Sequence, residues 1–350
     1  MELRFGHWLE EKHFGNIFLL RDLTIRLNAA EMYPGGREVI YHRDIFGLRG
    51  RFGSPEQVTI LTIGGSTTDQ RWVPDQDTFQ EVLAAHLAAS GPPLGVANGG
   101  LDGHSTVGHL HSFLYWFNQI PNLHPAWVIA CIGLNDINVG TSTRAQFDDT
   151  LNIRQGTLGQ RIKNHLKNNS AFWQMFNTIR GIFQANWVME IGGHGGMSTP
   201  RPRVHWAPYP HPIPSFESLP DARPRIQAYG ERVRELIRAI RGFGARAVIV
   251  TQKSDSFRYL QGRLHGQVSA NGQVFLDQAF PLLMGLNDQA LQVCREEGAV
   301  CLDLARELDL TGDDFYDSIH TTAQGSRKIG DYLFEKLGPL LIAASPQGRP

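Results

Sequence analysis

Three side chains in this sequence have the types and the spacing that nucleophilic catalysis requires. Ser66 follows Gly64 and Gly65 and opens a helix-like stretch, where free N–H groups and the helix dipole favour a developing anion. Asp317 and His320 lie three residues apart, so the carboxylate can fix the tautomer of the imidazole. A histidine held in this way can take the proton of a serine hydroxyl. Taken singly, each segment also fits a helix cap after a turn.

Two further segments offer groups that can stabilise an oxyanion. Residues 98–106 read NGGLDGHST, and Gly103 within them lets the backbone approach a ligand and point an N–H at it. Asn135, in the segment GLND at 133–136, can aim its amide N–H at the same oxygen. The alternatives are a capped turn at 98–106 and an Asx-turn that closes a strand at Asn135.

The elements that must position these segments form an alternating pattern. Short apolar runs predict strands, and the stretches between them predict helices: strands at 58–63, 94–97, 126–132, 247–251 and 299–304, and helices at about 77–89, 104–119, 222–240 and 322–337. This alternation predicts a parallel sheet covered on both faces, a doubly wound α/β/α sandwich with right-handed crossovers. Because ligands bind beyond the carboxyl ends of such strands, the four segments are expected to converge there.

The chain divides into a core domain with additions before, within and after it. We expect a lead-in at 1–57 that packs on the core, a domain at 58–340 with a helical and loop insert at 141–220, and a tail at 341–350. The end of the insert is rich in Pro, Gly and aromatic residues, which predicts a loop that orders over substrate. Trp206 and Tyr209 from this loop, together with Asp136, are expected to bind substrate. The alternative is a surface loop without a role.

Composition and charge exclude several classes of protein. The 350 residues are 41% hydrophobic with a formal net charge of −1, which is ordinary for a soluble globular protein and gives no electrostatic reason for a nucleic-acid partner.

The three cysteines form neither a disulfide framework nor a zinc site: they are Cys131, Cys294 and Cys301, and Cys131 and Cys301 are expected to be packed core thiols. The histidines at 104, 109 and 111 lack the spacing of a zinc pair, so no metal is expected. There is neither an apolar stretch long enough to span a membrane nor a signal-peptide pattern at the start.

In order and composition, the four segments resemble the blocks of the SGNH (GDSL-like) hydrolase superfamily. IGGST at 63–67 resembles its first block, Gly103 its second, GLND at 133–136 its third, and DSIH at 317–320 its Asp-x-x-His block. The usual first block reads Gly-Asp-Ser, whereas Gly65 occupies the Asp position here. GGSTT-type blocks resemble a bacterial branch associated with cell-surface glycans. The resemblance implies a flavodoxin-like sheet of about five strands.

The resemblance also implies a mechanism and a substrate class. His320, oriented by Asp317, takes the proton of Ser66, which attacks an ester carbonyl. The oxyanion is met by the backbone N–H groups of Ser66 and Gly103 and by the Asn135 amide. We therefore expect a serine esterase that needs no cofactor or metal and hydrolyses an acyl ester, acetyl above all, on a small molecule or a carbohydrate.

Other functions fit the same residues. One is an O-acyltransferase that passes the acyl group to a cell-surface glycan, and another is a non-catalytic glycan-binding or assembly protein on the same scaffold. A third is a flavodoxin-like nucleotide binder, in which Asp317 and His320 would be idle. The opening residues resemble bacterial members with an N-terminal membrane helix, so we expect an extracytoplasmic location with an anchor outside this chain. A cytoplasmic location is the alternative.

Overall fold

The centre of the fold is a parallel sheet of five strands. The computed structural model describes residues 13–14, 17–19, 21–141 and 204–343, and the expectations for 142–203 and 344–350 lie outside these ranges. The strands lie in the order β13-β9-β7-β5-β6 and are parallel throughout. This order confirms the predicted doubly wound, flavodoxin-like sheet. Its strands are β5 (Val58–Gly64), β6 (Gly95–Asn98), β7 (Trp127–Ile132), β9 (Arg246–Thr251) and β13 (Val300–Leu302).

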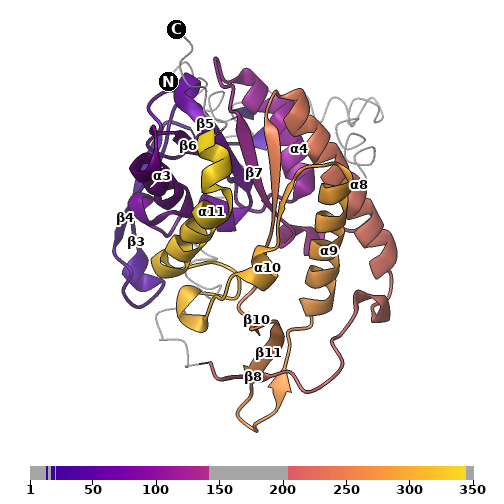
Figure 1. Ribbon diagram of the computed structural model, residues 1–350. Helices are drawn as coiled ribbons and strands as arrows, with labels where there is room; N and C mark the ends of the chain where they lie inside the picture. The colour runs from indigo at the N-terminus through magenta and orange to yellow at the C-terminus, as the bar shows by residue number, and fades with distance from the viewer. Residues whose placement is uncertain (1–12, 15–16, 20, 142–203, 344–350) are drawn as a thin grey trace, which may run out of the picture.

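Helices cover both faces of this sheet (Figure 1). One face packs against α3 (Phe79–Ser90) and α11 (Ala323–Ala343), which also pack against each other. The other face packs against α4 (Thr106–Tyr115), α8 (Ala222–Gly242) and α9 (Phe280–Glu296). Of these, α9 was not predicted, although a crossover between the parallel strands β9 and β13 requires such an element. Two short helices, α2 (Ser66–Asp69) and α10 (Leu304–Glu307), follow β5 and β13 directly.

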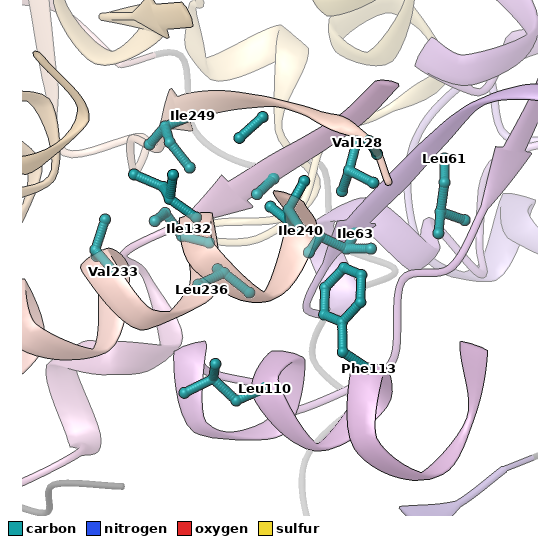
Figure 2. Packing of buried hydrophobic residues seen from close by; sticks show 14 of the residues in the cluster. Leu61, Ile63, Leu110, Phe113, Val128, Ile132, Val233, Leu236, Ile240 and Ile249 are labelled. Carbon is teal, nitrogen blue, oxygen red and sulfur yellow. The ribbon is translucent and has the colours of Figure 1, made fainter. Parts of the chain in front are cut away.

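Alternating side chains of the strands build two hydrophobic layers. Leu61 and Ile63 of β5 point toward α4 and α8, whereas Ile60 of the same strand points toward α3 and α11. Figure 2 shows the first layer, in which Phe113 of α4 and Leu236 of α8 meet the strand side chains. Burying one such side chain contributes roughly 1.5–3 kcal/mol. The rigid sheet that results fixes the carboxyl ends of the strands.

Smaller elements are added at the rim of the core. The lead-in contains the antiparallel pairs β1 (His13–Phe14) with β2 (Ile17–Phe18) and β3 (Leu23–Asn28) with β4 (Glu38–Arg43). An antiparallel sheet joins β8 (Trp206–Pro208), β10 (Phe257–Leu260), β11 (Arg263–Val268) and β12 (Val274–Phe275), and lies at one end of the molecule in Figure 1. The Pro-rich end of the insert was expected to be a loop without packed elements. In its described part, this expectation is wrong for Trp206–Pro208, which form strand β8. Short 3-10 helices complete the fold: η1 (Ala29–Glu31), η2 (Pro55–Gln57), η3 (Asp75–Asp77), η4 (Phe117–Gln119), η5 (Asn135–Asn138), η7 (Phe216–Ser218) and η8 (Gly312–Asp314).

The cysteines correct one expectation. Cys294 and Cys301 form a disulfide with a Cα–Cα distance of 6.0 Å, so Cys301 is not a free core thiol. The tight turn between α9 and β13, closed by the bond from Ala299 N to Cys294 O, brings the two together. Cys131 is a buried free thiol, as expected. Among the described helices, none combines the length and the apolar character needed to cross a bilayer.

Acid sensitivity is expected from a buried histidine on α4. Burial lowers the pKa of His109 to about 3, so the ring stays neutral in the folded chain where an unfolded histidine would bind a proton. The stability that depends on this difference is present above pH 6.5 and is lost as the pH falls toward 3. Between pH 7 and pH 4, the free energy of unfolding of the wild type should therefore fall by roughly 3 kcal/mol more than that of His109→Met.

Urea unfolding at several pH values measures this difference. His124 is exposed, and His124→Met is the matched control that should follow the wild type. Parallel pH curves for the wild type and His109→Met would contradict the expectation.

Candidate active site

Ser66 is the first residue of α2, directly beyond the end of β5. Gly65 caps this helix, and its carbonyl accepts hydrogen bonds from the N–H groups of Thr68 and Asp69. A Cβ on Gly65 would lie 2.1 Å from Asn135 Nδ2, closer than packed atoms can approach. Glycine at this position therefore lets the Asn135 amide lie against the turn that carries Ser66.

The loop between η8 and α11 carries Asp317 and His320. Phe315 and Thr321 form an antiparallel bridge, and Tyr316 N donates to His320 O at 2.9 Å, so the loop is closed at its base. Asp314 is fully buried there and accepts from the Nζ of Lys328 at 2.7 Å and from the backbone N of Thr311, also at 2.7 Å. The loop is thus a fixed structure.

Ser66, His320 and Asp317 form one continuous chain of hydrogen bonds. The distance from His320 Nε2 to Ser66 Oγ is 2.7 Å, and that from His320 Nδ1 to Asp317 Oδ2 is 2.6 Å. The other oxygen of Asp317 accepts from the backbone N–H groups of Ile319 and His320. Burial raises the pKa of the Asp317 carboxyl, but the hydrogen bond and charge of His320 outweigh it, and the pKa lies below its usual value. The carboxylate is therefore ionised and aligned to stabilise an imidazolium.

The two predicted oxyanion donors lie on adjoining turns. Asn135 begins η5, three residues after the end of β7, and its Nδ2 donates to the carbonyl of His104 at 2.8 Å. One N–H of this amide remains for a ligand. Gly103 precedes that carbonyl and has a φ of +75°, in the left-handed region that favours glycine. The structure thus brings the Gly103 turn, the Asn135 amide and the turn before Ser66 together.

Asp136 does not belong to this surface, and the expectation that it binds substrate is wrong. The residue is 2% exposed. Its Oδ1 accepts from Thr106 Oγ1 at 2.6 Å, and it forms an ion pair with the buried Arg232 at 3.3 Å. It also accepts from Thr106 N and so caps the first turn of α4. This carboxylate anchors α4 and α8 beneath the site.

Gln252 is a residue of the site that the sequence reasoning missed. It directly follows β9, and its Nε2 donates to Thr67 Oγ1 at 2.8 Å while its Oε1 accepts from Leu134 N at 3.1 Å. One side chain therefore joins the residue after the serine to the residue before Asn135. Its position at a strand end is the same signal that identified Ser66 and Asn135, and that signal could have found it.

A buried ionic cluster from the lead-in supports α2, and it was also missed. Arg43 and Asp69 are 1% and 2% exposed and pair at 2.7 Å, and Tyr41 OH donates to the same carboxylate at 2.8 Å. Arg49 donates to the carbonyls of Asp69 and Gln70 at 2.6 and 2.8 Å. Arg43 thus fixes the side chain of Asp69, and Arg49 fixes the backbone three and four residues after Ser66. Nothing in the lead-in sequence alone pairs these arginines with α2.

Trp206 and Tyr209 lie in and directly after β8. Trp206 packs under the guanidinium of Arg258, 5.6 Å from its ring centroid, and Arg258 pairs with Asp309. Tyr209 packs against a hydrophobic cluster that includes Leu134, the residue before Asn135, and Ile319 packs against the same cluster. Among the described residues, no contact brings either ring to Ser66.

A small cavity lies beside the hydrogen-bonded chain. Thr67, Leu134 and Ile319 form part of its wall, and each is next in sequence to a residue of the site. Lys253 also lines it, and burial lowers the pKa of this lysine to about 8. The rest of the wall is mostly apolar and buried, and includes Phe79, Val250, Leu304, Leu310 and Phe315. The cavity is thus a small, mostly apolar space next to residues that flank Ser66, Asn135 and His320 in the chain.

Comparison with known proteins gives a family match. Residues 62–328 match the model of the GDSL-like Lipase/Acylhydrolase family. No curated protein matches the sequence significantly. In fold, the chain is similar to LAE5, an alpha/beta hydrolase from the metagenome of Lake Arreo, Spain (14% identity, TM-score 0.43, 80% of this chain and 95% of that chain). It is also similar to Axe2, an acetylxylan esterase from Geobacillus stearothermophilus (13% identity, TM-score 0.41, 80% and 93%).

The contacts of Gln252 predict a measurable effect on the reactivity of Ser66. Gln252→Ala removes both of its tethers, and we expect the rate of Ser66 labelling by a fluorophosphonate probe to fall about tenfold, since small misplacements of a nucleophile are costly. Thr67→Val removes only one tether and should cost less. The double variant should be no slower than Gln252→Ala, because both changes act on the same contact. Independent, multiplicative losses would contradict the tether.

Proposed function

The chain belongs to the GDSL-like lipase/acylhydrolase family, and we propose that it is a serine esterase that works through an acyl-Ser66 intermediate. The observation that carries the proposal is the continuous chain from Asp317 through His320 to Ser66. Such a chain needs all three groups at hydrogen-bonding distance, and a packing role requires none of this alignment.

The geometry supports the following sequence of steps. Ser66 Oγ attacks the ester carbonyl while His320 Nε2 takes its proton, and the ionised Asp317 stabilises the imidazolium. The free N–H of Asn135 and the backbone N–H groups of Ser66 and Gly103 are the proposed donors to the oxyanion. His320 then returns the proton to the leaving alcohol. Water, activated by the same imidazole, hydrolyses the acyl-enzyme.

We assign the acyl group to the cavity beside Ser66, which favours a short chain. The cavity has a volume of about 40 Å³. One water molecule needs roughly 10–15 Å³ on this measure, so there is room for only a few heavy atoms. An acetyl group fits this space, whereas a long acyl chain exceeds it. The mostly apolar wall suits the methyl end of such a group.

For the alcohol side we propose a carbohydrate, and for the protein an extracytoplasmic location. The first is supported by the GGSTT block and by Tyr209, an aromatic side chain directly after β8 that packs against the cluster containing Leu134, the residue before Asn135. The second is supported by the Cys294–Cys301 disulfide, because such bonds persist in oxidising compartments.

Kinetics of an aryl acetate test the roles of the site residues. Ser66→Ala and His320→Ala should each abolish nearly all turnover, and the double variant should be little worse, since the groups act as a unit. Asn135→Ala should lower kcat by roughly 100- to 1000-fold through the lost oxyanion donor. Losses that add in the Ser66/His320 double variant would rule out a shared step.

Adding a sugar acceptor and analysing the products separates hydrolysis from acyl transfer.

The size of the cavity predicts the acyl preference. Leu304 is 5% exposed and lines the cavity, so Leu304→Ala should make room for two more methylene groups. We expect the ratio of kcat/KM for butyryl over acetyl aryl esters to rise about tenfold, as burial of two methylenes allows. Leu236→Ala, a core truncation on the other face of the sheet, is the matched control and should leave this ratio unchanged. An unchanged ratio in Leu304→Ala would place the acyl group elsewhere.

A further inference from the structure

Two tyrosines form a stack behind the imidazole of His320. The ring of Tyr316 is nearly parallel to that of His320, with an interplanar angle of 9° and a centroid distance of 5.5 Å. The ring of Tyr33 stacks on Tyr316 in turn, at 5.6 Å and 13°. Tyr33 and Tyr316 are 5% and 9% exposed. The base is thus supported by an aromatic column that is shielded from water.

The outer ring of this column comes from the lead-in, outside the residues that match the family model. Tyr33 lies just after η1, and its OH donates to the carbonyl of Trp72 at 3.1 Å. It packs in a small hydrophobic cluster with residues of β4, and Tyr316 is the member of that cluster from the His320 loop. The lead-in therefore supports the His320 loop through the contact of Tyr33 with Tyr316, and α2 through the ion pair of Arg43 with Asp69.

We propose that Tyr316, backed by Tyr33, is a positioning residue that holds the His320 imidazole by ring stacking and stabilises its protonated form. The inference rests on the proposed function, in which His320 becomes a cation when Ser66 attacks. A cation within about 6 Å of an aromatic centroid is attracted to the ring, and more strongly where water is excluded. The imidazolium would be stabilised more than the neutral ring, so the contact favours the transition state.

Other charged groups near the stack stay in place when its rings are changed. Asp317 contacts His320 Nδ1 from the same loop, and Ser66 contacts Nε2 from α2. The pKa of the Tyr316 hydroxyl is raised, mainly by burial and next by the charge of Asp317. Asp102 and Asp69 also lie close enough to raise it. The substitution Tyr316→Leu therefore removes none of these carboxylates from the chain.

The test compares Tyr316→Phe, which keeps the ring, with Tyr316→Leu, which removes it. Tyr316→Leu should lower kcat about 3- to 30-fold with KM within about twofold, and should move the acid limb of the kcat/KM profile to lower pH by about 0.5 pH units. Tyr316→Phe should behave like the wild type. Tyr33→Leu should give a smaller change in the same direction, since its ring acts on His320 only through Tyr316. Tyr332→Leu, a buried tyrosine truncation on α11, is the matched control for lost packing.

Three results would overturn the proposal: wild-type kinetics in Tyr316→Leu, an equal loss in Tyr316→Phe, or a lower kcat without movement of the acid limb. The proposed function is tested separately by turnover of the wild type that Ser66→Ala abolishes. If the wild type turns over no ester, NMR titration of the His320 ring still decides the stack. The titration should move to lower pH in Tyr316→Leu but not in Tyr316→Phe, and an unmoved titration contradicts the stack.

Discussion

The hydrogen bond between Ser66 Oγ and His320 Nε2 is the contact on which the site depends. It joins residues 254 positions apart, and the two come from opposite ends of the sheet domain. The parallel sheet brings the carboxyl ends of its strands to one edge and so makes this contact possible, and the buried layers on both faces hold that edge in place. The fold therefore determines the distance between Ser66 Oγ and His320 Nε2.

Side chains around this contact fix each partner separately. Gln252 and the Gly65 turn set the serine relative to Asn135, and Gln70 Nε2 reaches Thr321 Oγ1, next to His320, at 3.3 Å. Burial of the ion pair between Arg43 and Asp69 costs desolvation free energy, which is offset only when both charges are paired and hydrogen-bonded. The position of this ion pair under α2 links the lead-in to the nucleophile, so this addition to the family core is part of the site.

Sequence reasoning predicted what local patterns determine. The five strands and the four segments beyond them are set by apolar periodicity and turn residues, and Ser66, Asp317, His320 and Asn135 follow from those. What it missed depends on tertiary contacts. Asp136 has the residue type of a substrate ligand and was expected at the surface, but Arg232, 96 positions away, holds it in the core. The stack of Tyr33 on Tyr316 and strand β8 likewise depend on partners that no local pattern reveals. The Cys294–Cys301 disulfide spans only seven residues and was missed together with α9, the helix that ends beside Cys294.

A covalent intermediate on Ser66 is the central claim, and mass spectrometry of the enzyme during turnover tests it most directly. The wild type is mixed with an excess of an acetyl ester, quenched in acid within the steady state, and digested. The account predicts an added acetyl group on the peptide that contains Ser66, which disappears when the substrate is exhausted. Ser66→Ala should carry no label. Turnover by the wild type with Ser66 unmodified, or with the label on another residue, would contradict the account.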